Sequence, residues 1–535
     1  MLNKITKATI NGRSQKFLDR SFCEETGLPS LVLMEQAAQG LTDFLRKLLP
    51  LADIEPGRPI IFLAGNGGNG GDAWASARQM MGYGYRVKLL ELFPKKKLAD
   101  DARCNREAYL KLAGETLSID ELDRLLTCSG EDRPLALVDG IMGTGFTLER
   151  PLPESLQILL TKINRQKDIL KVAIDIPTGL ESATGAVANP SFEADYTVTF
   201  STYKTALYAD PATAYCGQLI LTPISMSSTW IDQKLAAFSS ATGEKPARLI
   251  DLDTARVLHV SRGPLSHKGN FGKCLIIGGS PGMAGAFQLA LRAARATGVG
   301  YCYGRTGPEG LPIALEAMPE ALLDSLPETS ADLLDLLGQV DSVAVGPGIG
   351  RSDWLTNFLP DLISHSPKLI LDADALNSLS LDPAWPDLFK VREAKGLVPA
   401  LLTPHPGEFS RLAPDLKDLA ARDRQAAARS LAQRSHCQIL LKGHRSVLAL
   451  PDGQVYLNSS GNQGLAKAGS GDVLTGLLAG FSAQYKDLDQ AAALAMFTHG
   501  YLAELAAQAE GFRLMQPGQL LDYCHQAYRD FDWLD

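Results

Sequence analysis

The stretch GNQGLAKAGSGDVLTGLLAG, residues 461–480, decides the fold of the second half of the chain. Its Gly-Ser-Gly turn at 469–471 directly precedes an apolar run, 473–481, that has the pattern of a helix. Glycines at a helix start let backbone N–H groups approach an anion, and the helix dipole favours negative charge there. Asp472 falls in the first helical turn, where its carboxylate can take a proton from a hydroxyl that receives a phosphoryl group. A single turn of this kind is more often only a capped helix start, so its companions decide the interpretation.

The companions of this turn are short loops that each follow a predicted strand, where α/β sheets hold their functional positions. The loop GPGIG at 346–350 lets the main chain approach a ligand. His405 stands between two prolines, which stiffen its loop and aim its ring. Asp372 and Asp374 can cap a helix or touch a hydrated metal near phosphates. Lys442 can meet a nucleotide phosphate, although a single lysine at a turn is more often a surface residue.

The first half of the chain alternates apolar runs with helical patterns. Such alternation predicts a doubly wound, Rossmann-like α/β sheet, and the second half repeats the pattern. The predicted strands are 60–64, 86–92, 135–138, 172–176 and 196–200, and the predicted helices between them are 73–81, 101–112 and 154–164.

Three loops of the first half carry oxygen-bearing side chains at strand ends: 65–72, 139–145 and 175–179. Asn, Asp and Thr oxygens gathered at one sheet edge can hold a phosphate-bearing ligand and a hard cation. Three ordinary strand-to-helix turns explain the same residues about equally well. The first loop lacks the G-x-G-x-x-G spacing, so the sequence does not predict dinucleotide binding of that type.

Composition sets the outer limits on function. The chain has 535 residues and a net charge of −8, which fits about two or three domains and argues against non-specific nucleic-acid binding. Its apolar runs are too short for a membrane span, and its N-terminus lacks the apolar core of a secretory signal. The eight cysteines form no CxxC pair, which predicts reduced thiols in a cytoplasmic protein. The Ser-, Thr- and Ala-rich stretch 224–245 predicts the domain junction, with domains at 1–225 and 226–535.

The first half resembles a known family. The segments NGGNGGDAWASAR, VDGIMGTG, IDIPTGL and ADYTVTFSTYKTAL are similar to the epimerase domain of the bifunctional NAD(P)H-hydrate repair enzymes, over about residues 18–221. The resemblance implies a potassium ion on Asn69, Asp139 and Thr178. Gly68 stands where the family usually has Asn, and Ala73 where it usually has Gly. The implied substrate-binding residues are Gly68, Asn69, Gly70, Gly71, Asp72, Gly143, Thr144, Gly145, Phe146, Thr147, Leu148, Glu149 and Asp175, of which Asp175 is expected to be catalytic.

The second half resembles the ribokinase-like fold, and in detail the ADP-dependent dehydratase domain of the same enzymes, over about residues 269–480. The segments GPGIG, DADALN, TPHPGEF, LKG and AGSGD carry this resemblance. It implies that the substrate hydrate lies against Gly348, His405 and the catalytic Asp472, with a magnesium ion in the domain. Leu465 replaces a frequent Met, and residues 280–283 lack an aromatic residue often found there. The implied nucleotide-binding residues are Lys442, Gly443, His444, Arg445, Ser446 and Gly471.

The resemblance implies a metabolite-repair reaction. Its substrates are NADHX and NADPHX, the adducts that form when water adds across C5–C6 of the nicotinamide ring and gives R and S epimers at C6. One domain interconverts the epimers, and the other dehydrates the S form with ADP, giving AMP and phosphate. No nucleic-acid or membrane partner is expected, and a homo-oligomer is expected by analogy. Two alternatives stay open: a kinase of a small hydroxylated metabolite, and a non-catalytic nucleotide-binding scaffold.

Overall fold

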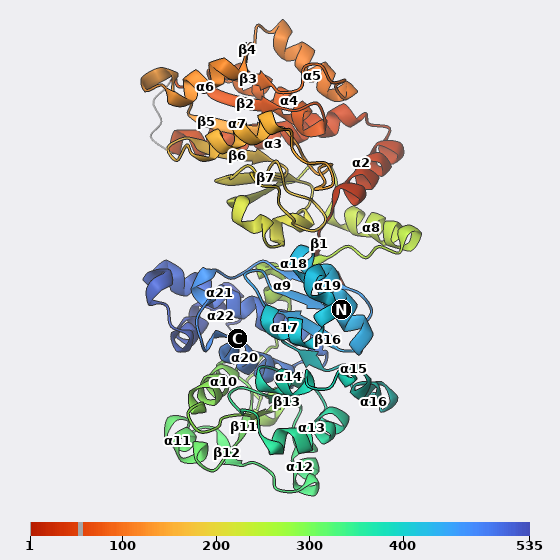
Figure 1. Ribbon diagram of the computed structural model, residues 1–535, viewed down its shortest axis with the longest axis vertical. Coiled ribbons are helices and arrows are strands. Elements are labelled where there is room, and N and C mark those ends of the chain that lie inside the picture. Colours follow the sequence, from red (N-terminus) through yellow and green to blue (C-terminus); the bar gives the residue numbers. More distant parts are fainter. Residues whose placement is uncertain (1, 52–56, 535) are drawn as a thin grey trace. The chain divides into compact units, whose positions relative to one another are not determined.

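The computed structural model describes residues 2–51 and 57–534, which form two compact units (Figure 1). The first unit is Ala8–Pro246 and runs from red to yellow-green in the figure. The second unit consists of the N-terminal residues up to Lys7 together with the chain from Ala247 onward. None of the helices in the described residues is long and apolar enough to cross a membrane.

The division between the units differs from the junction that the sequence predicts. The Ser-, Thr- and Ala-rich stretch is mostly a helix, α8 (Ser228–Thr242), which Ser227 caps. Its aromatic side chains pack on helix α2 (Gly12–Thr26): the ring centroids of Phe17 and Phe238 lie 5.4 Å apart. Burial of this apolar face ties α8 to the first unit, whereas a linker would have none. The predicted boundary at 225/226 therefore falls before the last helix of the first unit.

The sheet of the first unit is parallel, as predicted, and adds the strands β4 and β8 to the five predicted ones, in the order β4-β3-β2-β5-β6-β7-β8. The order reverses direction between β2 and β5, and ligands of doubly wound sheets bind at such a switch point. The strands are β2 (Ile60–Ala64), β3 (Val87–Glu91), β4 (Glu115–Leu117), β5 (Ala136–Gly140), β6 (Leu170–Ile174), β7 (Tyr196–Phe200) and β8 (Gln218–Thr222).

Helices cover both faces of this sheet. The side chains of β2 alternate between two apolar clusters, with Phe62 in one and Leu63 in the other, so its uninterrupted apolar sequence is that of a strand buried on both faces. Helix α4 begins at Gly68 rather than at Ala73, so the glycine-rich loop forms its first turn. The remaining helices are α3 (Ser30–Leu51), α5 (Asp100–Lys111), α6 (Ile119–Thr127) and α7 (Glu154–Asn164).

The second unit has an eleven-stranded sheet in the order β1-β9-β18-β17-β16-β15-β14-β13-β10-β11-β12. Pairing is parallel from β12 through β16, while β17 is antiparallel to both of its neighbours. The strands are β1 (Lys7–Ala8), β9 (Arg248–Ile250), β10 (Lys273–Ile277), β11 (Tyr301–Thr306), β12 (Leu322–Ser325), β13 (Ser342–Val345), β14 (Leu369–Leu371), β15 (Leu401–Leu402), β16 (Gln438–Leu441), β17 (Val447–Ala449) and β18 (Val455–Asn458).

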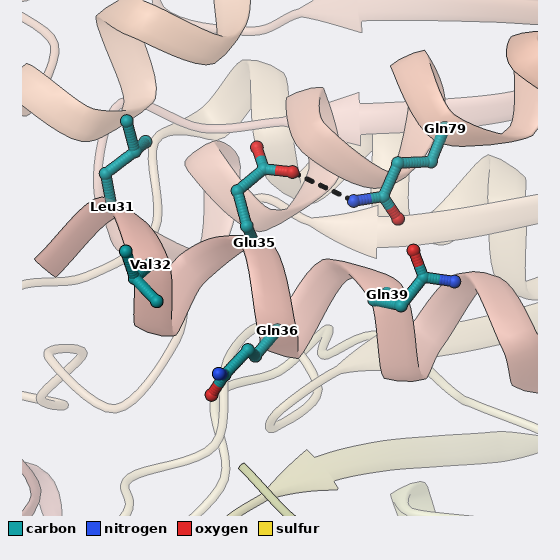
Figure 2. Close-up of a pocket in the computed structure, with 6 residues that line it drawn as sticks. All are labelled: Leu31, Val32, Glu35, Gln36, Gln39 and Gln79. Carbon is teal, nitrogen blue, oxygen red and sulfur yellow. Dashed lines mark hydrogen bonds between the residues drawn. The ribbon is translucent and has the colours of Figure 1, made fainter. Parts of the chain in front are cut away.

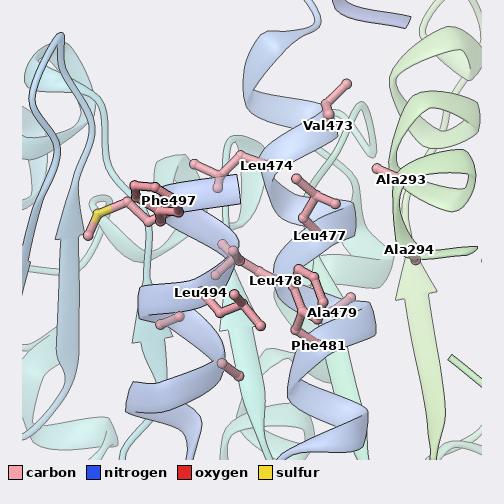
Figure 3. Packing of buried hydrophobic residues seen from close by; sticks show 14 of the residues in the cluster. Ala293, Ala294, Val473, Leu474, Leu477, Leu478, Ala479, Phe481, Leu494 and Phe497 are labelled. Atoms are coloured by element: carbon pink, nitrogen blue, oxygen red, sulfur yellow. The ribbon is translucent and has the colours of Figure 1, made fainter. Parts of the chain in front are cut away.

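Three helices form the apolar centre of the second unit: α10 (Ala284–Ala296), α20 (Ser470–Gln484) and α21 (Leu488–Leu514). Leu477, Leu478 and Leu494 pack among them (Figure 3). A Cβ on Gly476 would lie 2.1 Å from the Ala290 carbonyl oxygen, so the backbones of α20 and α10 are in close contact at this glycine. This packing fixes the N-terminus of α20, which carries Asp472.

Shorter helices complete the second unit. They are α1 (Leu2–Ile5), α9 (Leu252–Val257), α11 (Gly310–Ala317), α12 (Ser330–Leu337), α13 (Asp353–His365), α14 (Asp374–Leu379), α15 (Trp385–Leu388), α16 (Lys390–Ala394), α17 (Pro406–Leu412), α18 (Lys417–Arg422), α19 (Arg424–Ser435) and α22 (Cys524–Asp530).

Candidate active sites

A cavity of about 800 Å³ opens at the carboxyl ends of β2, β5 and β6, where the strand order of the first unit reverses. Most of the residues predicted to bind substrate line it. Gly70, Gly71, Leu148 and Glu149 do not, and their assignment stays a prediction. The predicted residues that line the cavity are Gly68, Asn69, Asp72, Gly143, Thr144, Gly145, Phe146, Thr147 and Asp175.

The glycines of this region serve two different purposes. A Cβ on Gly70 would lie 2.1 Å from the Gly65 carbonyl oxygen, and one on Gly71 would lie 2.4 Å from Cε of Met34. Packing against rigid backbone therefore requires glycine at position 70, whereas at position 71 the flexible Met34 side chain would have to move. A Cβ on Gly68 would meet nothing within 4 Å, so at this cavity-lining position glycine keeps space open for a ligand.

Asp175 and Lys204 form a buried ion pair in the cavity wall. Their charged atoms lie 2.5 Å apart, and the Lys204 side chain is 1% exposed. Asp175 also accepts a hydrogen bond from the Thr199 hydroxyl at 3.0 Å, and its backbone has φ +64°. A non-glycine residue in this strained conformation is typical of functional sites. The sequence analysis missed Lys204, which lies in the loop after the buried strand β7.

Three more carboxyl groups line the same cavity, those of Asp19, Asp72 and Asp101. Burial raises the pKa of Asp72 well above its ordinary value, and the negative charges of Asp175 and Asp19 add to the effect. Burial also raises the pKa of Asp19 to about 6, against a hydrogen bond from Gln15 that lowers it. The sequence analysis missed Asp19, because nothing in the pattern of α2 separates it from a solvated carboxylate.

The predicted potassium ligands are close together behind the cavity wall. The Thr178 hydroxyl donates to Asp139 at 2.7 Å, and Asn69 donates to the Met142 carbonyl oxygen at 3.2 Å. Met142 in turn donates its N–H to the Thr178 hydroxyl. Asp139 is fully buried, and burial raises its pKa to about 6, although hydrogen bonds from Thr178 oppose the shift. Within residues 2–51 and 57–534 the Asp139 carboxylate has no ion-pair partner, so its buried charge is not neutralised by the protein. That charge, together with the nearby side-chain oxygens of Asn69 and Thr178, fits a monovalent cation.

A smaller pocket of about 340 Å³ lies on α3, where it is lined by Glu35 and three glutamines (Figure 2). Glu35 accepts hydrogen bonds from Gln79 at 3.0 Å and from Arg78 at 2.5 Å. Glu35, the only carboxylate in the lining, is thus already paired with the Arg78 guanidinium, so this pocket offers no reactive group.

In the second unit, Asp472 lies in the first turn of α20, as predicted. Burial and the nearby charge of Asp372 raise the pKa of its carboxyl to about 6, while Lys442 opposes them. A carboxylate with this pKa is ionised at neutral pH and is still basic enough to accept a proton from a hydroxyl. Gly469 precedes the helix with φ +98°, a conformation that favours glycine and turns the chain into the helix.

Asp372 and Lys442 form a second buried ion pair beside this helix start. The Lys442 ammonium lies 2.6 Å from Asp372, which also accepts a hydrogen bond from the Thr475 hydroxyl at 2.6 Å. Burial alone would raise the pKa of Asp372, but Lys442 outweighs it and holds that pKa below its ordinary value. A Cβ on Gly471 would lie 3.5 Å from the Lys442 Nζ, so the ammonium lies beside the Gly-Ser-Gly turn.

His405 caps the start of helix α17. Its Nδ1 accepts hydrogen bonds from the backbone N–H groups of Gly407, at 3.0 Å, and of Glu408. Burial and the charge of Lys442 lower its pKa, so the ring is neutral at pH 7. Because Nδ1 accepts, the ring carries its proton on Nε2. Nε2 lies 3.4 Å from a Glu408 carboxylate oxygen, so contacts within α17 orient the ring, in a loop that the flanking prolines stiffen.

The predicted nucleotide loop, 442–446, follows β16. Arg424 of α19 donates to the Lys442 carbonyl oxygen at 3.0 Å, and a Cβ on Gly443 would lie 2.1 Å from its guanidinium. Arg445 donates to the carbonyl oxygen of Ser459. His444 is exposed. These contacts fix the loop, and they place Lys442 in the buried ion pair rather than at the surface.

Gly348 lies in the loop after β13 with φ +62°, and a Cβ there would lie 2.6 Å from the Met283 carbonyl oxygen. The next glycine along, Gly350, donates its N–H to Asp374 at 2.9 Å. The negative charge of Asp374 is felt at Asp472. The loops after β13, β14 and β16 and the start of α20 therefore converge on one place, as the sequence predicts.

These geometries define a two-unit α/β enzyme: one unit has a polar cavity at its switch point, and the other has a carboxylate beside an anion-binding helix start. Comparison with known proteins agrees. A family model described as YjeF-related protein N-terminus matches residues 30–206, and one described as NAD(P)H-hydrate dehydratase matches 274–526. The bifunctional NAD(P)H-hydrate repair enzyme Nnr of Moorella thermoacetica is 35% identical over 96% of this chain and 95% of its own.

Two further comparisons cover different shares of this chain. The enzyme of that name from Escherichia coli is 31% identical over 93% of this chain and 89% of its own. A solved ADP/ATP-dependent NAD(P)H-hydrate dehydratase from Bacillus subtilis, co-crystallised with ATP and Mg²⁺, is 28% identical, with TM-score 0.45, over 53% of this chain and 98% of its own. This chain belongs to the family of bifunctional NAD(P)H-hydrate repair enzymes.

Proposed function

We propose that the first unit interconverts R- and S-NAD(P)HX and that the second unit dehydrates the S epimer to NAD(P)H with ADP, giving AMP and phosphate. The observation that carries the proposal for the second unit is the ionisable Asp472 beside the Gly-Ser-Gly turn, with Lys442 next to it. The kinase alternative uses the same carboxylate, but such a kinase has no need of the first unit with its cavity and buried ion pair. The scaffold alternative has no use for two buried ion pairs.

Dehydration begins with proton transfer. Asp472 takes the proton of the 6-hydroxyl as that oxygen attacks the β-phosphorus of ADP, and AMP leaves. Phosphate is then a good leaving group, and its loss from C6 with a proton from C5 restores the dihydronicotinamide. Backbone N–H groups of the turn stabilise the moving phosphoryl charge, an interaction worth about 3–4 kcal/mol per donor in other enzymes. The neutral His405 donates from Nε2 to the substrate.

Magnesium and potassium are proposed from the donor sets. The described residues hold no cluster of three or more ligands typical of an all-protein metal site. Mg²⁺ usually binds one or two carboxylates together with substrate phosphates, and Asp374 would supply a carboxylate while the ion neutralises phosphate charge. Potassium would bind oxygens of Asn69, Asp139 and Thr178 and neutralise the buried carboxylate.

The remaining assignments stay predictions. ADP is proposed as the donor because the fused layout resembles that of the bacterial members. All eight cysteines are free, which agrees with the predicted reducing, cytoplasmic compartment. The homo-oligomer rests on analogy alone.

The test supplies mixed hydrate epimers to the full chain with ADP, with ATP or without nucleotide. Absorbance of reduced nicotinamide reports dehydration, and AMP and phosphate are quantified in parallel. We expect all of the substrate to be consumed, with one AMP and one phosphate formed per dihydronicotinamide. Product formation without nucleotide would contradict the phosphorylation step, and consumption of only part of the mixture would contradict the epimerase.

A further inference from the structure

The cavity of the first unit holds more carboxyl groups than its one buried ammonium can neutralise. Asp175 pairs with Lys204. Asp72 and Asp19 line the same cavity and are electrostatically coupled to that pair. Like charges gathered in a partly buried site cannot all be ionised, so the cluster retains an exchangeable proton near neutral pH.

Asp19 is held in this cluster by the way helix α2 begins. A Cβ on Gly12 would lie 2.3 Å from the Thr144 carbonyl oxygen, and the Gly12 N–H donates to the Ser182 hydroxyl at 3.1 Å. The first turn of α2 is therefore fixed against the loop that carries the predicted substrate contact Thr144. Asp19 follows two turns later on the same helix face, and Gln15 orients its carboxylate through a hydrogen bond of 2.7 Å.

We propose that Asp19 is a second catalytic proton-transfer residue of the epimerase site and acts together with Asp175 on the 6-hydroxyl of the hydrate. The inference rests on the proposed epimerase function. The two carboxyl groups come from different elements, α2 and the loop after β6, and both line the same cavity.

The chemistry needs two such groups. One carboxyl protonates the 6-hydroxyl, the C6–O bond breaks with its electron pair leaving on water, and the N1 lone pair forms a C6=N1 iminium. A water then adds to the opposite face of C6, its proton goes to the other carboxylate, and the electron pair returns to N1. One water leaves and one adds, and the proton moves from one carboxyl group to the other. A single acid–base group would serve only one face.

The pH behaviour of Asp19 depends on all the charged groups around it. Burial raises its pKa to about 6, and Gln15 and Lys204 oppose the shift. Because Asp175 is already ion-paired with Lys204, Asp19 supplies the proton that the reaction needs, so the epimerisation rate should fall as the pH rises above about 6 and Asp19 ionises. The groups near it are Lys204, Asp175 and Asp72 on other elements, Cys23 on the same helix, and Lys16 and Asp101 in the cavity lining.

The test measures the approach of purified R-NADHX to the R/S equilibrium without ADP, using the full chain with Asp19→Asn. We expect the turnover number to fall about 100-fold or more, with KM changed by less than about twofold. Asp19→Glu should recover part of the rate. Glu24→Gln, a change of an exposed carboxylate on the same helix, should leave it unchanged. Thermal unfolding of the variant, compared with the unmodified chain, reports that the first unit is folded, and dehydration of S-NADHX with ADP reports that the second unit is active.

A second variant probes the role without removing the carboxylate. Gln15→Leu deletes the hydrogen bond that lowers the pKa of Asp19, so the pH above which the epimerisation rate falls should move to a higher value. If Gln15→Leu leaves the pH dependence of epimerisation unchanged and Asp19→Asn keeps full activity, the inference is overturned. It is also overturned if Asp19→Asn changes only KM. If the unmodified chain does not epimerise at all, the proposed function fails instead.

Discussion

The Lys442 ammonium lies 2.6 Å from a carboxylate oxygen of Asp372, and this pair joins the end of β16 to the end of β14 beside the start of α20. Asp372 is 2% exposed and the Lys442 side chain 17%. The pair supplies positive charge next to the Gly-Ser-Gly turn, where phosphate charge develops in the proposed reaction. The same pair is therefore part of the fold of the second unit and part of its site.

Breaking this pair should destabilise the second unit. Lys442→Met leaves Asp372 buried without its partner, a change that costs about 3–5 kcal/mol in comparable cases. Chemical unfolding of the full chain measures it. Lys390→Met removes an exposed pair with Asp387 and should cost less than about 1 kcal/mol. Equal costs for the two variants would show that the buried pair does not stabilise the fold.

Dehydration should depend on the ionisation of Asp472. Its pKa is raised to about 6 by burial and Asp372, and the ionised form is the base. Below that pH, kcat/KM for S-NADHX should fall about tenfold per pH unit. A profile that stays flat to pH 5 would exclude Asp472 as the base.

Asp175→Asn should slow the use of the R epimer and leave the S epimer unaffected, because only the R epimer must pass through the first unit. Asparagine tolerates the positive φ of this position, so the comparison concerns charge rather than backbone strain. Rates on each purified epimer with ADP measure the effect. Equal losses on both epimers would contradict the division of labour.

Two glycines of one helical turn should respond differently to alanine. Gly68→Ala places a methyl group in open space at the cavity wall, so the melting temperature should hold while KM for epimerisation rises. Gly70→Ala forces a Cβ to 2.1 Å from the Gly65 carbonyl oxygen and should lower the melting temperature. The opposite pattern would show that packing, not ligand space, requires glycine at 68.

Potassium should stabilise the first unit by neutralising Asp139. Thermal unfolding in potassium chloride should occur at a higher temperature than in choline chloride of equal ionic strength, and Asp139→Asn should abolish the difference. A stabilisation that persists in that variant would place the cation elsewhere.

Much of the fold could be predicted from the sequence, because buried parallel strands read as unbroken apolar runs and glycine-rich loops follow them. The junction was wrong because composition does not reveal that Phe238 packs on α2. The helix start at 469–472 could be predicted because its glycines and the apolar run after them are local signals. Lys204 and Asp19 were missed because only the tertiary fold brings them to Asp175, from opposite ends of the first unit's sequence.

The most direct measurement uses the full chain with Asp472→Asn. Equilibrium titration with ADP and single-turnover formation of NADH from S-NADHX are recorded on the same preparation. The account predicts ADP binding within about threefold of the unmodified chain and a dehydration rate at least about 1,000-fold lower. Dehydration at a near-normal rate would contradict the assignment of Asp472 as the base that starts phosphoryl transfer.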